Sequence, residues 1–150
     1  MNLSTNFTLE EMTFSQTAAR RGIDNTPTPE HFRNLRRLCA LLEDVRDVVG
    51  TPIRVTSGYR CPELNRAVGS RAKYSQHTFG CAADIKCVGV SVEETIEIII
   101  EADLPFDQMI MEFAGSPSGG WVHISVPNDP QDKPRKEVLI SDSKGERPYV

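Results

Sequence analysis

The chain changes its hydrophobic period at Gly50–Pro52, and this change restricts the possible folds more than any other sequence feature. Between residues 32 and 49, apolar residues recur at steps of three and four, which predicts one long amphipathic helix. Thr28 and Pro29 are typical of the start of such a helix, and Gly50 is typical of its end. After Pro52 the apolar residues follow a period of two, which indicates strands.

Capping and alternation signals predict the other elements. Thr8 with Glu11 forms a capping box before a short helix, and a second short helix at 15–21 should stop at Gly22. Further helical segments are expected at 61–65 and from Ser91 to about residue 102. Strands are predicted at 53–56, 82–87, 106–113 and 121–126, with a short edge strand at 137–140. We expect 66–79 to be mostly loop and 141–150 to be a polar, mobile tail.

The order of these elements favours an α+β fold. Helices come first, and they are followed mainly by strands with one inserted helix. The third and fourth strands should pair in antiparallel fashion across the turn-forming loop at 115–120. We therefore expect N-terminal helices packed on a small, mainly antiparallel sheet. With 150 residues the chain has the length of a single domain.

Composition excludes several classes of function. The formal net charge of −4 disfavours general nucleic-acid binding, which needs a basic face. No stretch approaches the roughly 20 apolar residues of a membrane span, and no signal peptide is visible at the N-terminus. No two of the four cysteines have C-x-x-C spacing, which disfavours a zinc ribbon or a thioredoxin motif. Because no signal peptide is visible, reduced thiols are expected. A disulfide between Cys81 and Cys87 stays open at this point.

Two segments, 75–84 and 121–126, carry residues that are typical metal ligands. His77 lies in a loop that leads into a predicted strand, Asp84 lies on that strand, and His123 lies in the middle of the fourth strand. Two imidazoles and one carboxylate form the three-ligand set of a catalytic zinc site, whose fourth position stays open for water. The alternative is that His77 caps a loop, Asp84 pairs with an arginine, and His123 is a hydrogen-bonded core residue.

Three sequence elements resemble motifs of the zinc D-alanyl-D-alanine carboxypeptidase family, which includes D,D-dipeptidases and phage endolysin peptidases. Upstream, Ser57-Gly58-Tyr59-Arg60 with Asn65 is similar to the S-G-Y-R…N element of the family. The family motif S-x-H-x-x-G-x-A-x-D is matched by Ser75, His77, Gly80, Ala82 and Asp84. Downstream, the segment 121–125 resembles the strand that carries the last metal ligand. The three elements occur in the family order, and the N-terminal helices look like those of the branch found in phages.

This resemblance implies a hedgehog/D,D-peptidase fold. Residues 1–50 would be its helical part, 51–140 its metal-binding sheet and 141–150 a tail. It also implies one Zn²⁺ per chain, held by His77, Asp84 and His123, and hydrolysis of peptide bonds in peptidoglycan stem peptides. Zinc lowers the pKa of a bound water to about 7. The resemblance further implies a monomer made in the cytoplasm, encoded by a phage or prophage, that acts on the bacterial cell wall.

The general base is the point where this chain departs from the family pattern. In several members an acidic residue lies three positions before the last histidine, and here that position is Gly120. Pairing of the third and fourth strands would instead bring Glu112 beside His123. We therefore expect Glu112 to be the base, with Asp107 as the second candidate. The alternative is that Glu112 is an exposed strand carboxylate.

Substrate contacts are expected from side chains near these motifs. Arg60 would bind a substrate carboxylate or stabilise the oxyanion, unless it forms a salt bridge with Glu63 or Asp84. The other candidates are Arg71, Gln76, Tyr59 and Trp121. For Arg71 the alternative is a solvated loop charge, for Gln76 a supporting role behind a metal ligand, and for the two aromatic residues a place in the core.

A second function remains compatible with the sequence. Zinc is structural in some hedgehog-like domains, and in a non-catalytic zinc-binding module of that kind Glu112 would be dispensable. Within the peptidase hypothesis, both carboxypeptidase and endopeptidase action remain open, at either a D-Ala-D-Ala or an L-Ala-D-Glu bond.

Overall fold

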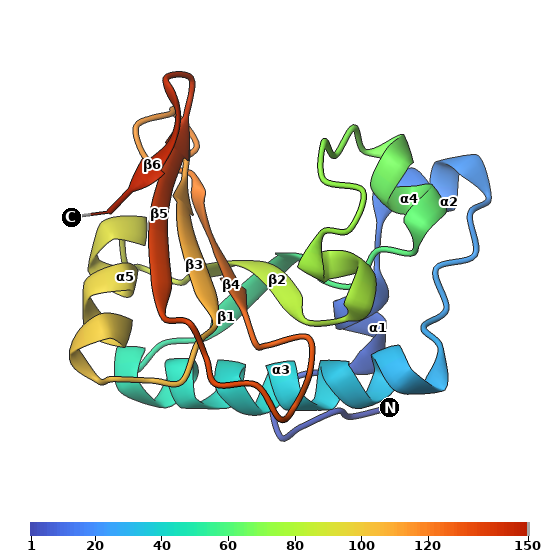
Figure 1. Cartoon of the computed structure of the whole chain (residues 1–150), viewed down its shortest axis with the longest axis horizontal. Helices are drawn as coiled ribbons and strands as arrows, with labels where there is room; N and C mark the ends of the chain where they lie inside the picture. The colour runs from blue at the N-terminus through green and yellow to red at the C-terminus, as the bar shows by residue number, and fades with distance from the viewer. Residues whose placement is uncertain (150) are drawn as a thin grey trace.

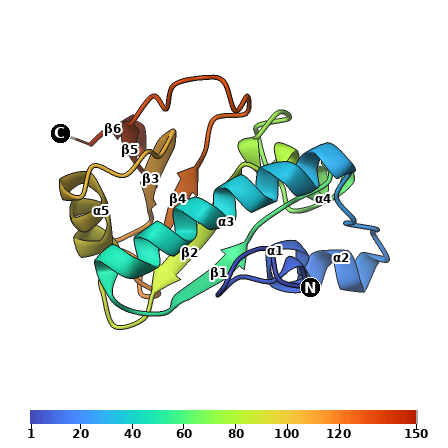
Figure 2. The ribbon, with the colours of Figure 1, turned by 90° about the horizontal axis from the view of Figure 1, so that it is seen from below.

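Helix α3 (Pro29–Val49) is 21 residues long and runs across one face of a six-stranded sheet (Figures 1 and 2). The computed structural model describes residues 1–149. Thr28 caps the helix through its side chain, which accepts a hydrogen bond from the backbone N–H of His31, and Gly50 ends it in a left-handed conformation. The predicted start and end of this helix are therefore confirmed.

The other helices are short. They are α1 (Leu9–Thr13), α2 (Gln16–Arg21), α4 (Pro62–Ala67), the 3₁₀ helix η1 (Gln76–Phe79) and α5 (Val92–Glu101). In the Thr8–Glu11 capping box, each side chain accepts a hydrogen bond from the backbone N–H of the other residue. Gly22 ends α2 as predicted. Ser91 caps α5 by accepting a hydrogen bond from the backbone N–H of Glu94. Among residues 1–149, no helix combines the length and the apolar character that crossing a membrane requires.

The sheet has the strand order β1-β2-β4-β3-β5-β6. Its strands are β1 (Ile53–Ser57), β2 (Ala82–Cys87), β3 (Gln108–Glu112), β4 (Trp121–Ser125), β5 (Glu137–Asp142) and β6 (Gly145–Pro148). Every neighbouring pair is antiparallel except β3 and β5, which are parallel. The expected α+β class with a mainly antiparallel sheet is confirmed.

Two expectations about the C-terminal part are wrong. The predicted edge strand at 137–140 is β5, which extends to Asp142 and lies inside the sheet. Of the tail predicted at 141–150, residues 141–142 end β5, and Gly145–Pro148 form β6, which is the edge strand on this side of the sheet. Val150 lies outside the described residues. Backbone hydrogen bonds to β5 hold β6, together with a bidentate ion pair between Arg147 and Asp142 at 2.8 and 2.9 Å. An exposed, polar edge strand carries no apolar alternation that a sequence pattern could reveal.

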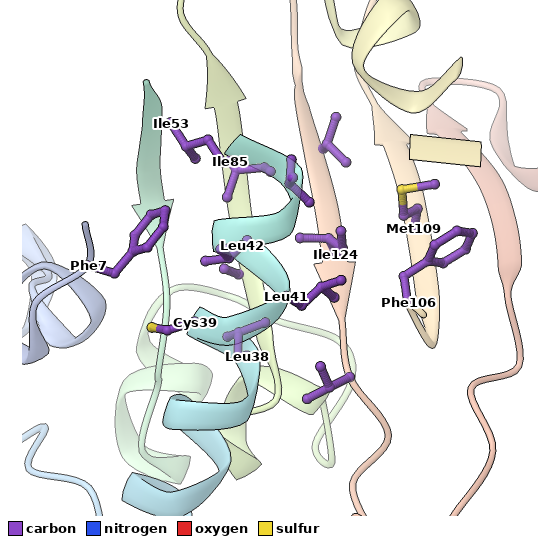
Figure 3. Packing of buried hydrophobic residues seen from close by; sticks show 14 of the residues in the cluster. Phe7, Leu38, Cys39, Leu41, Leu42, Ile53, Ile85, Phe106, Met109 and Ile124 are labelled. Atoms are coloured by element: carbon purple, nitrogen blue, oxygen red, sulfur yellow. The ribbon is translucent and has the colours of Figure 1, made fainter. Parts of the chain in front are cut away.

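The hydrophobic core lies between α3 and the sheet. Leu38, Leu41 and Leu42 of the helix point toward Ile85 of β2 and Ile124 of β4 (Figure 3). All five side chains are at most 4% exposed. At roughly 25 cal/mol per Å² of buried apolar surface, this contact is the main force that holds the helix on the sheet.

Polar contacts fix the segment between α4 and β2 to the same helix. Gly80 has a positive φ of 75°, and a Cβ atom there would lie 2.6 Å from the carbonyl oxygen of His31, so only glycine fits. Asn34 donates a hydrogen bond to the carbonyl of Phe79 at 2.8 Å. Arg37 donates to the carbonyl of Pro127 at 2.8 Å. Helix α3 therefore sets the position of η1, which carries His77.

The four cysteines are free thiols. Burial raises the pKa of Cys39 to about 12 and that of Cys81 to about 11, so both stay protonated and behave as small core residues. Cys81 precedes β2 and Cys87 ends it. The strand between them spans roughly 20 Å at about 3.3 Å per residue, which is too far for a disulfide.

The β3–β4 turn closes on Gly120. This residue has a φ of +72°, and a Cβ atom added to it would overlap the carbonyl oxygen of Glu112 and lie 2.6 Å from that of Phe113. No side chain fits at this position in the observed backbone, so Gly120 cannot be replaced by an acidic residue unless the turn changes.

We predict that Gly120→Ala destabilises the protein by about 2–4 kcal/mol, because it adds a backbone collision to an unfavourable left-handed conformation. Gly119→Ala is the matched control, since Gly119 also has a positive φ of 81° but nothing lies near its Cβ position. This control should lose only about 1 kcal/mol. Urea denaturation measures both values, and equal losses would contradict the collision.

Candidate metal centre

Strand pairing brings two of the predicted ligands together. Asp84 of β2 lies directly opposite His123 of β4, so both side chains project from the same face of the sheet. His77 reaches them from η1, whose Ser75 cap accepts a hydrogen bond from the backbone N–H of His77. The backbone N–H of Arg60 donates to the carbonyl of His77 at 3.1 Å, which ties the segment 57–60 to the same loop.

The three side chains converge on one point. Asp84 Oδ1 lies 3.2 Å from His77 Nε2 and 3.3 Å from His123 Nδ1. All three candidate ligand atoms lie within 4.8 Å of one another. His77 and His123 are buried residues, with exposed fractions of 2% and 8%.

The hydrogen bond behind His77 fixes its tautomer. Its Nδ1 lies 2.7 Å from the carbonyl oxygen of Gly58, which can only accept, so Nδ1 carries the proton. In the neutral ring, Nε2 then presents its lone pair to the Asp84 carboxylate. Two acceptors that face each other repel, unless a cation or a proton lies between them. A backbone carbonyl in this place is also the usual support for a metal-binding histidine.

These residues fit a zinc ion. Zn–N and Zn–O bonds of about 2.0–2.1 Å in a tetrahedron place neighbouring ligand atoms about 3.3 Å apart. The two measured distances from Asp84 Oδ1 agree with this spacing. The set has two neutral imidazoles and one carboxylate, and three protein ligands are typical of a catalytic zinc site rather than a structural one.

The charge state of Asp84 suits a ligand. Burial opposes its ionisation, but hydrogen bonds from the rings of His77 and His123, and the positive charge that these rings carry when protonated, outweigh burial and hold the pKa of Asp84 well below its usual range. Asp84 is therefore a carboxylate at neutral pH, and it does not need to lose a proton when a cation binds.

Glu112 lies beside this triad. In the β3–β4 ladder, Glu112 is opposite Trp121 and Ile110 is opposite His123. Glu112 and His123 therefore lie in adjacent rows on the same face of the sheet. Trp121 donates its indole N–H to Glu112 Oε2 at 2.7 Å. Burial and the negative charge of Asp84 raise the pKa of Glu112, while His123 and the indole hydrogen bond lower it to a smaller extent. A raised carboxyl pKa is typical of a general base that works near neutrality.

A cleft opens over the triad and Glu112. Of the sequence-predicted residues, Arg60, Arg71, Gln76 and Trp121 line it. Arg60 forms neither of the considered salt bridges among residues 1–149, and its buried Nε atom has no hydrogen-bond partner in that range. Burial lowers the pKa of Arg60, whereas Asp84 and Glu112 raise it. The guanidinium is therefore a charged donor that faces the cleft.

Tyr59 does not line this cleft, and its expected substrate contact is wrong. The side chain is 3% exposed, belongs to the core, and lies with its hydroxyl 3.3 Å from His31 Nδ1. The backbone N–H of Tyr59 also donates to the carbonyl of Met12 at 2.8 Å, which ties this residue to α1. The alternative considered for Tyr59 from the sequence, a place in the core, is therefore the one observed.

Gln76 and Asp107 belong to a polar network next to the triad, in which Asp107 is buried and Gln76 is half-buried. Gln76 Nε2 donates to Asp107 Oδ2 and to the carbonyl of Val126, at 3.2 and 3.0 Å. Arg135 donates to both oxygens of Asp107 at distances of 2.9–3.2 Å. Gln76 thus anchors the helix that carries His77, and Asp107 is occupied by these donors. Geometry therefore favours Glu112 over Asp107 as the base.

Sequence reasoning missed two charged residues of the cleft, Arg135 and Glu146. Arg135 lies between β4 and β5. Its place at the cleft follows from its hydrogen bonds to Asp107, a residue that no local sequence pattern connects with it. Glu146 lies on β6 and is opposite Ser141, which is opposite Glu112. It was missed because the segment was read as a tail.

Comparison with known proteins gives one finding. The model of a family described as Peptidase M15 matches residues 5–125, which include the triad, Arg60 and Glu112. No curated protein matches the chain significantly.

We predict that the protein binds about one zinc ion per chain and that zinc stabilises it. At a free zinc concentration of 100 Kd the gain is about 2.7 kcal/mol, which a chelator should reverse. His123→Ala and Asp84→Ala should lose this response, because each removes a ligand atom. His31→Ala is the control, since His31 lies outside the triad. Thermal denaturation with and without zinc measures the effect, and an unchanged response in both ligand variants would disprove the site.

We also predict a pH-dependent role for Asp107. Burial raises the pKa of Asp107, but the combined effect of Arg135 and Gln76 is larger and lowers it. The pKa in the folded protein therefore lies below the unfolded value of about 3.9. Its contribution is complete above that value and is lost as the pH falls through the folded pKa. Asp107→Asn should therefore lose about 1–3 kcal/mol at pH 7 and less at pH 3. Urea denaturation at both pH values tests this, with the exposed Asp132→Asn as control.

Proposed function

The chain belongs to the peptidase M15 family, which implies a zinc metallopeptidase, and we propose that it hydrolyses peptide bonds in peptidoglycan stem peptides. The observation that carries this proposal is the convergence of His77, Asp84 and His123 at the base of a cleft that also contains Glu112. The proposal includes the hedgehog/D,D-peptidase fold for the helices and sheet described above.

We assign His77, Asp84 and His123 as the ligands of one zinc ion. Zinc in such a site lowers the pKa of a water to about 7 and polarises the scissile carbonyl. Gly58 orients His77 through its carbonyl, and the strand pairing of β2 with β4 orients the other two ligands. The support is the fit of the donor atoms and their separations to a tetrahedral ion.

Glu112 is proposed as the general base. Its Oε2 is held by the indole of Trp121, which leaves Oε1 free to take a proton from the attacking water and to deliver it to the leaving amine. Burial and the charge of Asp84 raise the pKa of Glu112, and this direction favours a carboxylate that both accepts and returns a proton. Because Gly120 has no room for a side chain, an acid on the neighbouring strand replaces the acid of the family pattern.

Arg60 and Arg71 are proposed to bind the substrate. A guanidinium beside the triad suits either the developing oxyanion or a terminal carboxylate of the stem peptide. Oxyanion stabilisation serves an endopeptidase and a carboxypeptidase alike, whereas binding of a terminal carboxylate serves only a carboxypeptidase. We further propose that the protein acts as a monomer on the bacterial cell wall, in the manner of a phage or prophage endolysin.

We predict that Glu112→Gln lowers kcat on purified peptidoglycan by about 10²–10⁴-fold, because the amide cannot accept the proton. The amide oxygen can still accept the Trp121 hydrogen bond, so folding and zinc content should be unchanged. Glu101→Gln, at the exposed end of α5, is the matched control and should retain full activity.

Mass spectrometry of the released muropeptides measures this activity and identifies the bond that is cut. Unchanged release by Glu112→Gln would remove Glu112 as the base. If the wild type binds zinc but releases nothing, the protein is instead a non-catalytic zinc-binding module.

A further inference from the structure

Asn25 lies in the linker between α2 and α3, and its side chain bonds to both peptide groups that flank Arg60. Its Nδ2 donates to the carbonyl of Tyr59 at 2.9 Å, and its Oδ1 accepts from the backbone N–H of Cys61 at 2.8 Å. The same Nδ2 donates a second hydrogen bond, at 2.9 Å, to the carbonyl of Thr13. Both donor hydrogens of the amide are therefore used, and they join the linker to the end of α1 and to the Arg60 segment.

The segment 58–61 has no secondary structure of its own to fix it. It lies between β1 and α4 and belongs to neither. The backbone N–H of Arg60 donates to the carbonyl of His77, and His77 Nδ1 donates back to the carbonyl of Gly58. The segment is therefore part of the support of a candidate metal ligand. Asn25 supplies the side-chain bonds to this segment that a substitution can remove without changing a candidate ligand.

The guanidinium of Arg60 depends on its backbone for a defined position. Its Nε atom is buried and has no hydrogen-bond partner among residues 1–149. The charges of Asp84 and Glu112 both act on this guanidinium. An arginine near two carboxylates gains by pairing with one of them. Such a pair would withdraw the guanidinium from the cleft and would occupy either a candidate metal ligand or the proposed base.

We propose that Asn25 is a positioning residue for Arg60. By fixing the peptide groups on both sides of Arg60, it holds the guanidinium in the cleft beside the triad and keeps it from pairing with a carboxylate of the site. This inference rests on the proposed function, which assigns Arg60 its role in hydrolysis. The three hydrogen bonds of the Asn25 side chain all go to backbone atoms, so Asn25 acts through Arg60 and is not itself a catalytic residue.

The first test is a double-mutant cycle on the zinc-loaded full chain, with soluble peptidoglycan fragments as substrate. Arg60→Ala should lower kcat/KM by about 10²–10³-fold. Asn25→Ala should lower it by about 10–10²-fold, and through the same parameter, kcat or KM, that Arg60→Ala changes. In the double variant, Asn25→Ala should add less than about a twofold loss, because the guanidinium on which it acts is already absent.

Controls separate positioning from loss of the fold or of the metal. Asn25→Ala should still bind about one zinc ion per chain, because its hydrogen bonds involve none of the three candidate ligands. Asn6→Ala is the matched control, since it removes an amide that instead donates to Glu43 of α3, and it should leave kcat/KM within about twofold of wild type. If Asn25→Ala does not fold, Asn25→Asp replaces it, because the carboxylate keeps the acceptor for Cys61 and removes only the two donor bonds.

The second test needs no activity. It follows the hydrogen exchange of the Arg60 Nε–H group by NMR, with Arg60→Lys to identify the resonance. Because this nitrogen is buried, its hydrogen should exchange slowly in wild type and at least about tenfold faster in Asn25→Ala. Asn6→Ala should leave the exchange rate within about twofold of wild type.

The outcomes distinguish the two proposals. If wild type cleaves the fragments and Asn25→Ala either keeps full activity or costs as much without Arg60 as with it, the positioning role is wrong and the peptidase function stands. If wild type cleaves nothing, the proposed function fails, and the exchange of the Arg60 Nε–H group alone decides the positioning role. Faster exchange in Asn25→Ala then supports this role, and an unchanged exchange rate overturns it in either case.

Discussion

The antiparallel pairing of β2, β4 and β3 is the constraint on which the site depends. Its register places Asp84 beside His123 in one row and Trp121 beside Glu112 in the next row on the same face. A shift by one residue in either ladder would turn these side chains into the core. The apolar contacts between α3 and the other face of the sheet oppose such a shift, so the same packing that stabilises the fold also aligns the chemistry.

The site holds groups that are unfavourable together in the absence of a cation. The Asp84 carboxylate, the Nε2 lone pair of His77 and the Glu112 carboxylate are all acceptors within one partly buried region. Their positions are nevertheless fixed from behind by Gly58, by Trp121 and by the Gln76–Asp107 network. The fold thus maintains a preorganised, electron-rich pocket, which is the arrangement that a divalent ion stabilises.

Local signals predicted most of the fold from the sequence. The caps at Thr8, Thr28 and Ser91 and the period of α3 depend on neighbouring residues only, and these elements agree with the structure. Strands β1 to β4 were also predicted because each has an apolar face. The edge strand β6 was missed because its contacts with β5 are made by the backbone and by charged side chains.

In the site too, residues that stand in local motifs could be predicted, whereas residues placed by contacts between distant segments could not. The three triad residues stand in recognisable motifs, and Glu112 followed from the expected strand pairing. Arg135 and Glu146 depend on contacts between distant segments, and Tyr59 is tied to Met12 by a backbone hydrogen bond.

The parallel attachment of β5 to β3 has a consequence for the rim of the cleft. Residues 126–149 lie outside the matched family region, yet they supply Arg135 and Glu146 to the rim of the cleft. Val138 and Ile140 of β5 pack against the core, and Arg135 supports the network behind His77, so these residues are constrained. Glu146 is exposed on the edge strand β6, which joins the sheet through backbone hydrogen bonds to β5, and it can therefore vary without disturbing the triad. Under the proposed function, this position offers a route to a changed substrate preference in which the candidate metal ligands keep their places.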